Sequence, residues 1–502
     1  MSLATVNSRA QLGTDAPRVA IEVFLSGGLP SFSIVGMAET AVRESKDRVR
    51  SALISSGFKW PQERITVSLA PADMRKSGGR FDLAIALGIL AASRQLPAEC
   101  FANVEFYGEL SLDGELRPVP ALLPAAIRAA GLGNAVLVPE PNADEAVLAE
   151  AEVLAARSLV DVTAHLRGAN TIEARARTRR RTVRRDEPDV ADVRGQSQAL
   201  RALEVAAAGG HNLLFIGPPG TGKSMLARRL PGILPAMTEQ EALEAAAILS
   251  VLGRQPDPSN WRRRPFRAPH HTASPAALVG GGPGPSPGEV SRAHNGVLFL
   301  DELPEFNRNV LEVLREPLEA GVITIARAGG QHDFPASFQL IGAMNPCPCG
   351  YLGDPRGDCG CSAERVATYR SKVSGPLLDR IDLHVEVGRP PRAALRDDAP
   401  AGESSRRVAA RVARARRRQL RRGGTCNARL AGAQLAQDCA LSKEALNLLE
   451  NAADKFNLSA RAYQRVRRVA RTIADLAGSD DINVAHIAEA LSLRQLDKKA
   501  PR

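Results

Sequence analysis

The stretch NLLFIGPPGTGKSMLARRL, residues 212–230, decides the fold of this chain. It opens with a short apolar run of the kind that forms a buried parallel strand, and it closes with a helical pattern. Between the two, the glycines and a Lys-Ser pair match G-x-x-x-x-G-K-[ST]. A simple glycine-rich turn would not need the Lys-Ser pair. The stretch therefore predicts a phosphate-binding loop between a strand and a helix.

This loop predicts a nucleotide site that uses Mg²⁺. Its glycines let backbone N–H groups curve around phosphate oxygens without Cβ clashes, and the helix N-terminus adds a favourable dipole. Lys223 is expected to reach the β- and γ-phosphates, and Ser224 to bind Mg²⁺. The residues expected to line the nucleotide are Gly217, Pro218, Pro219, Gly220, Thr221, Gly222, Lys223, Ser224 and Met225.

A second motif, GVLFLDEL at residues 296–303, predicts the acidic partner of the loop. Four apolar residues, typical of a buried strand, end in Asp301 and Glu302. A carboxylate at the carboxyl end of such a strand can hold Mg²⁺, and its neighbour can orient or deprotonate the attacking water. We predict that Asp301 binds the metal and that Glu302 activates water. The alternative is a pair of surface acids after a strand.

A chain of 502 residues is too long for one core, and its patterns divide it into three domains and a linker. Strand-like and helical runs alternate in the first and in the nucleotide-binding parts, which predicts an α/β fold for both. The last part has a helical pattern, with Ser442 and Ser459 at expected N-caps. The expected ranges are 1–165 (α/β domain), 166–189 (basic linker), 190–395 (nucleotide-binding core) and 396–502 (helical domain).

The net charge of +11 is concentrated in two clusters, at residues 174–185 and 406–422. Such clusters attract nucleic-acid backbones, but they also occur in solvated linkers and on helix faces, and charge alone leaves both readings open. No apolar run approaches the length of a membrane span, and the N-terminus shows no secretory pattern. Seven cysteines, an odd and low number, favour a reducing cytosol, so we expect a cytoplasmic protein.

Four of the cysteines lie in NPCPCGYLGDPRGDCGC, residues 345–361. Two closely spaced pairs separated by a turn-rich loop can surround one tetrahedral Zn²⁺. Four thiolates leave no open position for water, so the predicted zinc is structural rather than catalytic. Free thiols or a redox disulfide are the alternative. The expected ligands are Cys347, Cys349, Cys359 and Cys361.

The order of these motifs resembles that of the AAA+ ATPases. In such proteins a strand ending in a polar residue follows the acidic strand, and Asn345 matches this sensor-1 position. SGPLLDRIDLHVEV, residues 374–387, resembles the segment with the arginine finger, which makes Arg380 the finger candidate. LSARAYQRV, residues 458–466, resembles the sensor-2 region, with Arg461 as the residue that reaches the γ-phosphate. Without the resemblance, the sequence favours interpretations that have no catalytic role. These are an ion pair of Arg380 with Asp379 or Asp382 and an exposed helix position for Arg461.

Longer segments resemble the ComM/YifB family of magnesium-chelatase-like proteins, notably residues 266–306, 315–350 and 458–482 and much of the N-terminal region. The resemblance implies a ring, with six subunits expected, that hydrolyses ATP and threads DNA. It implies helicase and branch-migration activity in homologous recombination and natural transformation. The alternatives are a magnesium-chelatase-type ATPase subunit that drives metal insertion into a porphyrin, and a non-catalytic DNA-binding scaffold.

The resemblance also implies two insertions that line a central pore, at residues 268–292 and 322–336. The second insertion reads on its own as a β-hairpin around Gly329 and Gly330, with Arg327 and His332 placed to touch a nucleic-acid backbone. His270, His271 and His294 are too weak a pattern for a metal site, so we expect hydrogen-bonding structural roles for them.

The N-terminal region resembles the catalytic domain of Lon-type peptidases, which use a Ser-Lys dyad. The position of the nucleophile falls near Arg80, with Asp82 just beyond, and Ser77 lies on the wrong side of the double glycine. Leu123 stands at the position of the catalytic lysine. Because neither position can do the chemistry, we expect an inactive Lon-like domain that assembles subunits or binds nucleic acid.

Overall fold

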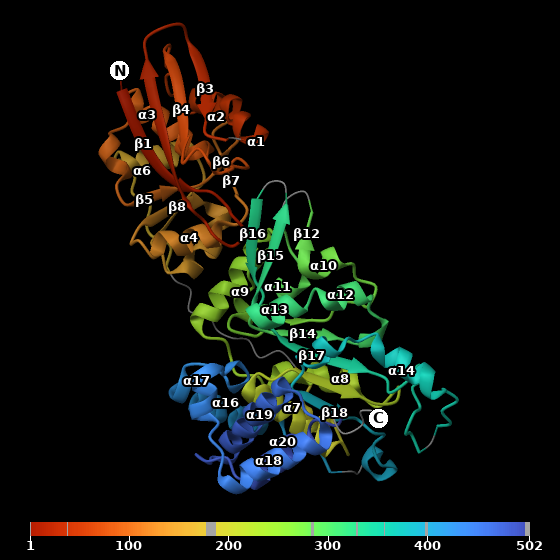
Figure 1. Ribbon diagram of the computed structural model, residues 1–502. Helices are drawn as coiled ribbons and strands as arrows, with labels where there is room; N and C mark the ends of the chain where they lie inside the picture. Colours follow the sequence, from red (N-terminus) through yellow and green to blue (C-terminus); the bar gives the residue numbers. More distant parts are fainter. Residues whose placement is uncertain are drawn as a thin grey trace.

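The computed structural model describes residues 2–37, 39–176, 187–282, 286–327, 330–355, 357–396 and 400–496, without the side chains at 40, 41, 258, 326, 327 and 395. The N-terminal domain lies at one end of the molecule, the nucleotide-binding core in the middle and the helical region at the other end (Figure 1). Residues 177–186 of the predicted basic linker lie outside the described part of the chain. No helix of the described part is both long and apolar enough to cross a bilayer.

The core is built on a five-stranded parallel sheet with the order β11-β14-β17-β10-β18. The strands come from the short apolar runs of the sequence, and four of them have mostly buried side chains. The predicted α/β core is therefore confirmed. The strands are β10 (Leu213–Ile216), β11 (Phe266–Arg267), β14 (Val297–Leu300), β17 (Gln339–Met344) and β18 (Leu383–Glu386).

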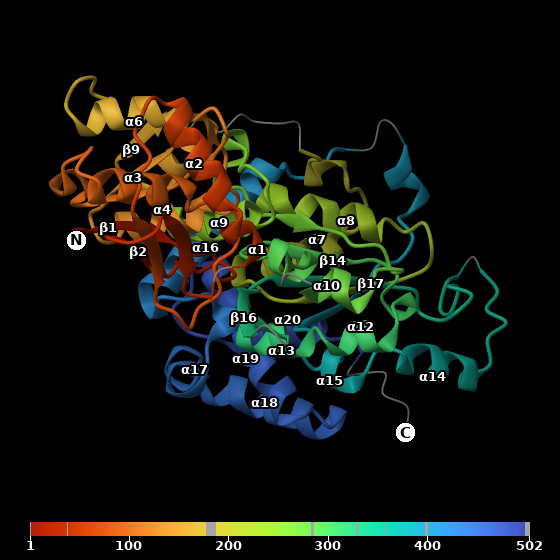
Figure 2. The same ribbon diagram turned by 90° about the horizontal axis from the view of Figure 1, so that it is seen from above.

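Alternate side chains of the sheet enter two different hydrophobic cores, as the period of two along a strand requires. Phe215 and Phe299 face one core, and Leu214 and Leu298 face the other. The helices and hairpins of this domain are α7 (Ser197–Gly209), α8 (Lys223–Arg229), α9 (Glu239–Val251), α10 (Pro275–Val279), β12 (Gly280–Gly281), β13 (Ser286–Pro287), α11 (Glu289–Arg292), α12 (Arg308–Glu312), α13 (Arg315–Ala320), β15 (Val322–Arg327), β16 (Gly330–Pro335), α14 (Ala363–Ser371) and α15 (Gly375–Leu378). Both views place α14 on the side of the core away from the N-terminal domain (Figure 2).

The C-terminal region is helical, as predicted, and shares one continuous core with the first face of the sheet. The two predicted N-caps are confirmed: the Ser442 hydroxyl accepts from the Ala445 N–H at 3.2 Å, and the Ser459 hydroxyl from the Ala462 N–H at 3.1 Å. The helices are α16 (Ser405–Gly423), α17 (Gly432–Asp438), α18 (Lys443–Phe456), α19 (Ala460–Ala477) and α20 (Val484–Ser492).

The basic cluster at 406–422 forms most of α16, and several of its arginines are used inside the molecule. Arg411 pairs with Glu204 and Glu403, and Arg422 pairs with Asp475. The Arg416 guanidinium donates to backbone carbonyls of α7. For these three side chains, intramolecular contacts replace both of the roles expected from the sequence, a solvated helix face and a nucleic-acid contact.

The N-terminal domain contains a mixed seven-stranded sheet, which confirms the predicted α/β class. Helix α3 is buried along its whole length beneath this sheet. The strands of the large sheet, in their spatial order, are β3 (Ser31–Val35), β4 (Arg64–Ala70), β2 (Arg18–Ser26), β1 (Ser2–Arg9), β5 (Val104–Phe106), β8 (Ala135–Pro139) and β9 (Val153–Ala156). The remaining elements are α1 (Thr40–Arg43), α2 (Ser45–Ser55), α3 (Asp82–Ala92), β6 (Glu109–Leu110), β7 (Leu116–Arg117), α4 (Leu122–Ala130), α5 (Ala143–Ala146) and α6 (Leu159–Leu166).

The residues at the Lon-like catalytic positions have structural partners. The buried Arg80 donates to the backbone carbonyl of Pro120, and burial lowers its pKa to about 10. The buried carboxylate of Asp82 accepts from Arg48 Nε at 2.6 Å. Leu123 is fully buried in the domain core. These contacts give the side chains a packing role, and the lack of peptidase activity stays a prediction.

The N-terminal domain docks on the core through α4 and α9, which share a hydrophobic cluster. Ala246 of α9 is almost fully buried in this cluster. Ser250, near the end of α9, supplies the polar part of the contact: its carbonyl accepts from the Ala121 N–H and its hydroxyl from the Leu123 N–H, both at 3.3 Å. Leu123, which stands where Lon-type peptidases have their catalytic lysine, is therefore part of the contact between the two domains.

We predict that Ala246→Glu separates the N-terminal domain from the core. A carboxylate buried without a partner costs about 3–5 kcal/mol, which is large for a contact between domains. Hydrogen exchange should become faster in α4 and α9 while the strands of both sheets stay protected. Gln240→Glu, at an exposed position of the same helix, is the control. Unchanged protection of α4 in Ala246→Glu would contradict the described docking.

Candidate functional site

The phosphate-binding loop lies between β10 and α8, at the carboxyl end of the parallel sheet, and it forms one side of a cavity of about 390 Å³. The acidic motif and the sensor-1 position form the other side. The lining residues are Pro219, Gly220, Thr221, Gly222, Lys223, Ser224, Met225, Asp301, Glu302, Met344 and Asn345. Gly217 and Pro218 are not among them and instead accept hydrogen bonds from the Lys223 ammonium group.

Strand register explains why residues so far apart in sequence meet here. Ile216, the last residue of β10, lies opposite Met344, the last residue of β17. Leu300, the last residue of β14, lies opposite Gly342, which is two residues before the end of β17. The residues that follow these strands therefore emerge at one edge of the sheet.

Lys223 is held over the loop by three acceptors. Its Nζ donates to the Gly217 carbonyl at 2.7 Å, the Pro218 carbonyl at 2.9 Å and Asn345 Oδ1 at 3.1 Å. Burial lowers the pKa of Lys223, and the nearby Asp301 and Glu302 carboxylates oppose that shift. The structure thus brings the predicted lysine and the predicted sensor together in direct contact.

Ser224 and Asp301 also meet, because Ser224 Oγ donates to Asp301 Oδ2 at 2.5 Å. A hydroxyl and a carboxylate side by side are the oxygen ligands that Mg²⁺ takes in nucleotide sites. The pair therefore fits the ion, and these two residues would hold it next to the loop that receives the phosphates. Bound there, Mg²⁺ would neutralise phosphate charge.

Glu302 follows Asp301 in a left-handed backbone conformation, with φ of +51°. Its carboxylate lies 3.3 Å from the Nδ1 atom of His271, whose ring packs against His270 at a centroid separation of 4.1 Å. The expectation of a purely structural role was incomplete for His271, because it touches the residue predicted to activate water. The expectation is confirmed for His294, which pairs with Glu244 and accepts from the Ser337 N–H.

Gln196 was not singled out from the sequence, yet it supports the loop. Its amide donates to the Thr221 carbonyl at 2.6 Å from the start of α7. No local motif marks it, since the contact depends on how α7 packs beside the loop.

The four clustered cysteines come together as predicted from their spacing. Cys347 Sγ lies 3.3 Å from Cys349 Sγ and 3.7 Å from Cys359 Sγ, and the sulfur atoms of all four residues lie within 4.8 Å of one another. Zn–S bonds of about 2.3 Å would place tetrahedral thiolates about 3.8 Å apart. The cluster therefore suggests a structural metal, and zinc fits it.

The cysteine loop braces the phosphate-binding loop. Gly350, at φ of +88°, packs so closely on Pro219 that an added Cβ would lie 2.7 Å from the proline ring. Asp354 pairs with Arg389 at 2.8 Å, and Arg370 of α14 donates to the Pro346 carbonyl at 3.2 Å. The cysteine loop is thus joined to the phosphate loop, to α14 and to the segment that follows β18.

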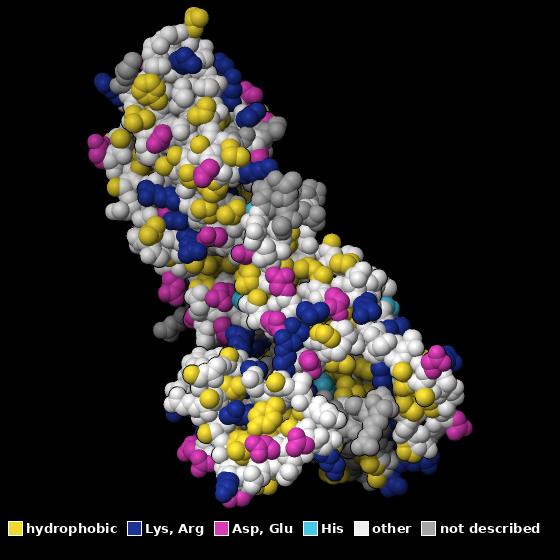
Figure 3. Space-filling view, in the orientation of Figure 1, with side chains coloured by type: hydrophobic (Ala, Val, Ile, Leu, Met, Phe, Trp, Pro, Cys, Tyr) yellow, Lys and Arg dark blue, Asp and Glu magenta, His cyan; other side chains and the backbone are white. Residues whose placement is uncertain are grey.

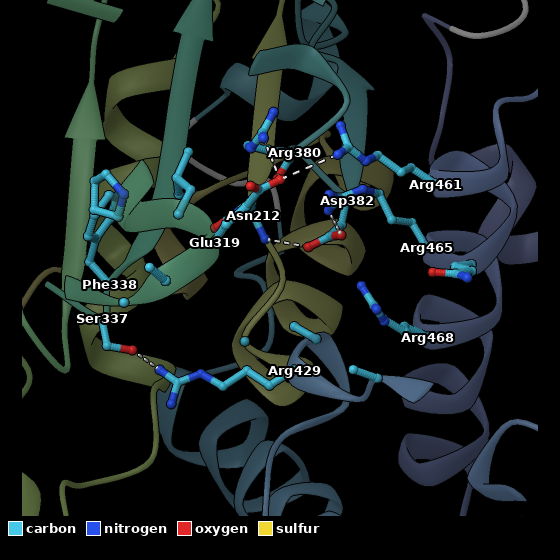
Figure 4. Close-up of a pocket in the computed structure, with 18 residues that line it drawn as sticks. Asn212, Glu319, Ser337, Phe338, Arg380, Asp382, Arg429, Arg461, Arg465 and Arg468 are labelled. Atoms are coloured by element: carbon cyan, nitrogen blue, oxygen red, sulfur yellow. Dashed lines mark hydrogen bonds and ion pairs between the residues drawn. The ribbon is translucent and has the colours of Figure 1, made fainter. Parts of the chain in front are cut away.

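Arg380 and Arg461 do not lie in this cavity. They line a second cavity of about 520 Å³ between α13 and α19, where Lys and Arg side chains gather at the hollow between core and helical region (Figure 3). Figure 4 shows both side chains pointing toward Glu319. Arg380 pairs with Glu319. The ion pair with Asp379 or Asp382, which the sequence offered as the alternative, was therefore wrong about the partner. Arg461 has a side chain that is 57% exposed and lies 3.7 Å from the same carboxylate.

The fold and this site define an ATPase of the AAA+ class: a phosphate-binding loop, an acidic strand end and a polar sensor position on a parallel five-stranded sheet. Comparison of the sequence with known proteins narrows this class to one family. The chain belongs to the ComM/YifB family of magnesium-chelatase ChlI-like proteins. The family implies an ATPase that uses ATP and Mg²⁺.

Three family models match in sequence order. "Subunit ChlI of Mg-chelatase" matches residues 21–142, "Magnesium chelatase, subunit ChlI" residues 189–395, and "Magnesium chelatase, subunit ChlI C-terminal" residues 402–494. Competence protein ComM of Haemophilus influenzae is 48% identical over 99% of this chain and 98% of its own length. YifB of Escherichia coli is also 48% identical over 99% of this chain and 98% of its own length. The magnesium-chelatase 38 kDa subunit of Cereibacter sphaeroides is 25% identical over 39% of this chain and 57% of its own length.

We predict about one zinc per chain in protein purified under reducing conditions without chelators, since four thiolates complete a tetrahedral site. Cys349→Ser should lower the zinc content, whereas Cys100→Ser, outside the cluster, should not. Elemental analysis of both variants and the parent chain measures this. A parent protein with no bound metal would refute the zinc assignment.

Proposed function

We propose that this protein is an ATP-driven, ring-forming DNA motor that acts as a helicase and branch-migration enzyme in homologous recombination, including the integration of DNA in natural transformation. The observation that carries the proposal is the full-length match to Competence protein ComM, which includes the N-terminal domain. That relative is named as a competence protein, and from its name we infer a role in the recombination of DNA that is taken up.

ATP hydrolysis is supported by the geometry of the nucleotide cavity. In the proposed roles, Lys223 contacts the β- and γ-phosphates, Ser224 and Asp301 hold Mg²⁺, and Glu302 activates water. Asn345 would help to place that water, and its contact with Lys223 joins the two positions. His271, 3.3 Å from Glu302, would influence the orientation of that carboxylate.

DNA contact is supported by the hairpin that stands beside the core sheet. Strands β15 and β16 pair over six residues each, as the sequence predicted, and the turn residue Gly329 lies outside the described part of the chain. His332, on β16, remains a candidate for backbone contact; the side chain of Arg327 is not described. The base of the hairpin touches the N-terminal domain, because Gly13 packs on Asp333 and Phe334.

A magnesium-chelatase-type role is the second candidate, and the match of the core to the chelatase subunit supports it. That match covers 39% of this chain, however, whereas the match to ComM covers 99%. A non-catalytic DNA-binding scaffold would not need the contacts among Lys223, Ser224, Asp301 and Asn345. We therefore favour the motor.

A ring is supported by the separation of the two cavities. Arg380 and Arg461 line a cavity that shares no residue with the nucleotide cavity of the same chain. In the proposed assembly, a hexamer in the cytoplasm, both arginines reach the nucleotide of a neighbouring subunit. An arginine there would stabilise charge on the transferring phosphoryl group.

We expect DNA to stimulate ATP hydrolysis, and Lys223→Ala to lower the stimulated rate by about 10²–10³-fold because a cationic contact to the phosphates is lost. Phosphate release should be measured with single-stranded, duplex, forked and four-way-junction DNA. An equal rate with and without every DNA would argue against the motor, and a rate that instead depended on a porphyrin-binding partner would favour the chelatase role.

We predict that Arg380→Ala lowers hydrolysis by about 10³-fold or more while ATP still binds, since an arginine finger acts on the transition state. Mixing Arg380→Ala with Glu302→Gln subunits should restore part of the activity, because the second variant supplies an intact finger to the first. A mixture of Arg380→Ala with the Glu302→Gln/Arg380→Ala double variant is the control. Absence of rescue in stable mixed rings would exclude a finger that acts across subunits.

A further inference from the structure

Glu319, near the end of α13, holds the finger candidate. Its Oε1 atom forms a short ion pair with Arg380 Nη2 and lies 3.7 Å from Arg461 Nη2 (Figure 4). Arg380 Nη1 donates at 2.5 Å to the carbonyl of Pro376. The buried Nε atom of Arg380 has no hydrogen-bond partner among the described residues.

This arrangement keeps Arg380 away from a phosphoryl group of another subunit. A guanidinium binds phosphate through paired N–H groups on one edge of its planar fork. Here one terminal nitrogen is used by Glu319 and the other by Pro376. The guanidinium keeps other N–H groups, but its Nε atom is buried and the side chain is only 6% exposed. Arg380 therefore has to leave this position before a phosphoryl group of a neighbouring subunit can meet two of its N–H groups.

Of the two residues of this ion pair, Glu319 is the one whose side chain can move away easily. The Arg380 side chain is only 6% exposed, whereas the Glu319 side chain is 53% exposed. Ion pairs that are open to water on one side are weak and reversible, because water replaces the partner. The contact can hold the arginine in the absence of a stronger anion without trapping it permanently.

Glu319 is also joined to the hairpin. Gly321, at φ of +70°, ends α13, and its carbonyl accepts from the Ala336 N–H at 2.8 Å, which closes the base of β15 and β16. Glu319 and Arg380 line a further cavity of about 440 Å³ together with Ile323 and Thr324 of β15. A displacement of the hairpin is therefore passed directly to the end of α13.

We propose that Glu319 is a latch: it holds Arg380, and more loosely Arg461, until a polynucleotide on the β15–β16 hairpin shifts the end of α13 and frees both arginines for the neighbouring subunit's nucleotide. The proposal rests on the proposed function, because it assumes a finger that acts across subunits. Glu319 is a positioning residue in this scheme and does not touch the nucleotide.

The test compares Glu319→Gln, which keeps the shape but removes the charge, with Glu316→Gln, on the same helix at an exposed position. Loss of a half-exposed ion pair should raise the ATPase rate without DNA by about two- to fivefold. The rate at saturating DNA and the KM for ATP should stay unchanged, so the stimulation ratio falls. Glu319→Asp, which retains a carboxylate, should restore part of the low basal rate, and Glu316→Gln should behave as the parent chain.

Three results would overturn the latch. The first is a Glu319→Gln variant whose DNA-free rate equals that of Glu316→Gln. The second is a Glu319→Gln variant whose rates fall both with and without DNA, which would mean that Glu319 aligns Arg380 rather than restrains it. Adding Arg380→Ala to Glu319→Gln should abolish the gain, and a gain that survived would also reject the latch. If the parent chain hydrolyses ATP without any stimulation by DNA, the motor function fails, while the DNA-free comparison still tests the latch.

Discussion

The register of three short parallel strands is the constraint on which the rest of this structure depends. Strands β10, β14 and β17 are buried on both faces, so each side chain fits one of two separate cores. A slip of one residue would exchange the two faces, which makes the register strongly specified. Because the register is fixed, the residues that follow the strands, Lys223, Asp301 and Asn345, have to meet at one edge. The nucleotide cavity is a direct consequence of how the sheet packs.

The arginine cavity obeys a different constraint, because two layers of the molecule form it. Arg380 and Glu319 come from the core, and Arg461 comes from α19 of the helical region. The shape of this cavity therefore depends on how the two layers pack, whereas the nucleotide cavity is lined by core residues alone. The cysteine loop joins the phosphate loop to α14 through Gly350 and Arg370, and so stiffens the core where the nucleotide is expected. The two cavities lie at opposite ends of the strands, since Asn212 and Asp382, which directly precede β10 and β18, line the arginine cavity.

Local pattern was sufficient where a feature depends on neighbours in sequence. The strand before the phosphate loop, the caps at Ser442 and Ser459 and the grouping of four thiols follow from spacing and residue type. It was insufficient where partners come from distant segments. Nothing near Arg380 pointed to Glu319, which is 61 residues away, and nothing marked His271 as the neighbour of Glu302. The charge of α16 suggested an exposed basic surface, yet the acidic partners of Arg411 and Arg422 lie on other elements.

In the proposed ring, one subunit binds ATP, and the arginines of the next subunit complete the site. A structure of the assembled protein with a non-hydrolysable ATP analogue tests this arrangement most directly. We predict that the triphosphate lies against residues 217–224 of one subunit, with Arg380 of its neighbour at hydrogen-bond distance from the γ-phosphate and no longer paired with Glu319. A triphosphate bound elsewhere, or an Arg380 that stays on Glu319 in every subunit of a nucleotide-filled ring, would contradict it.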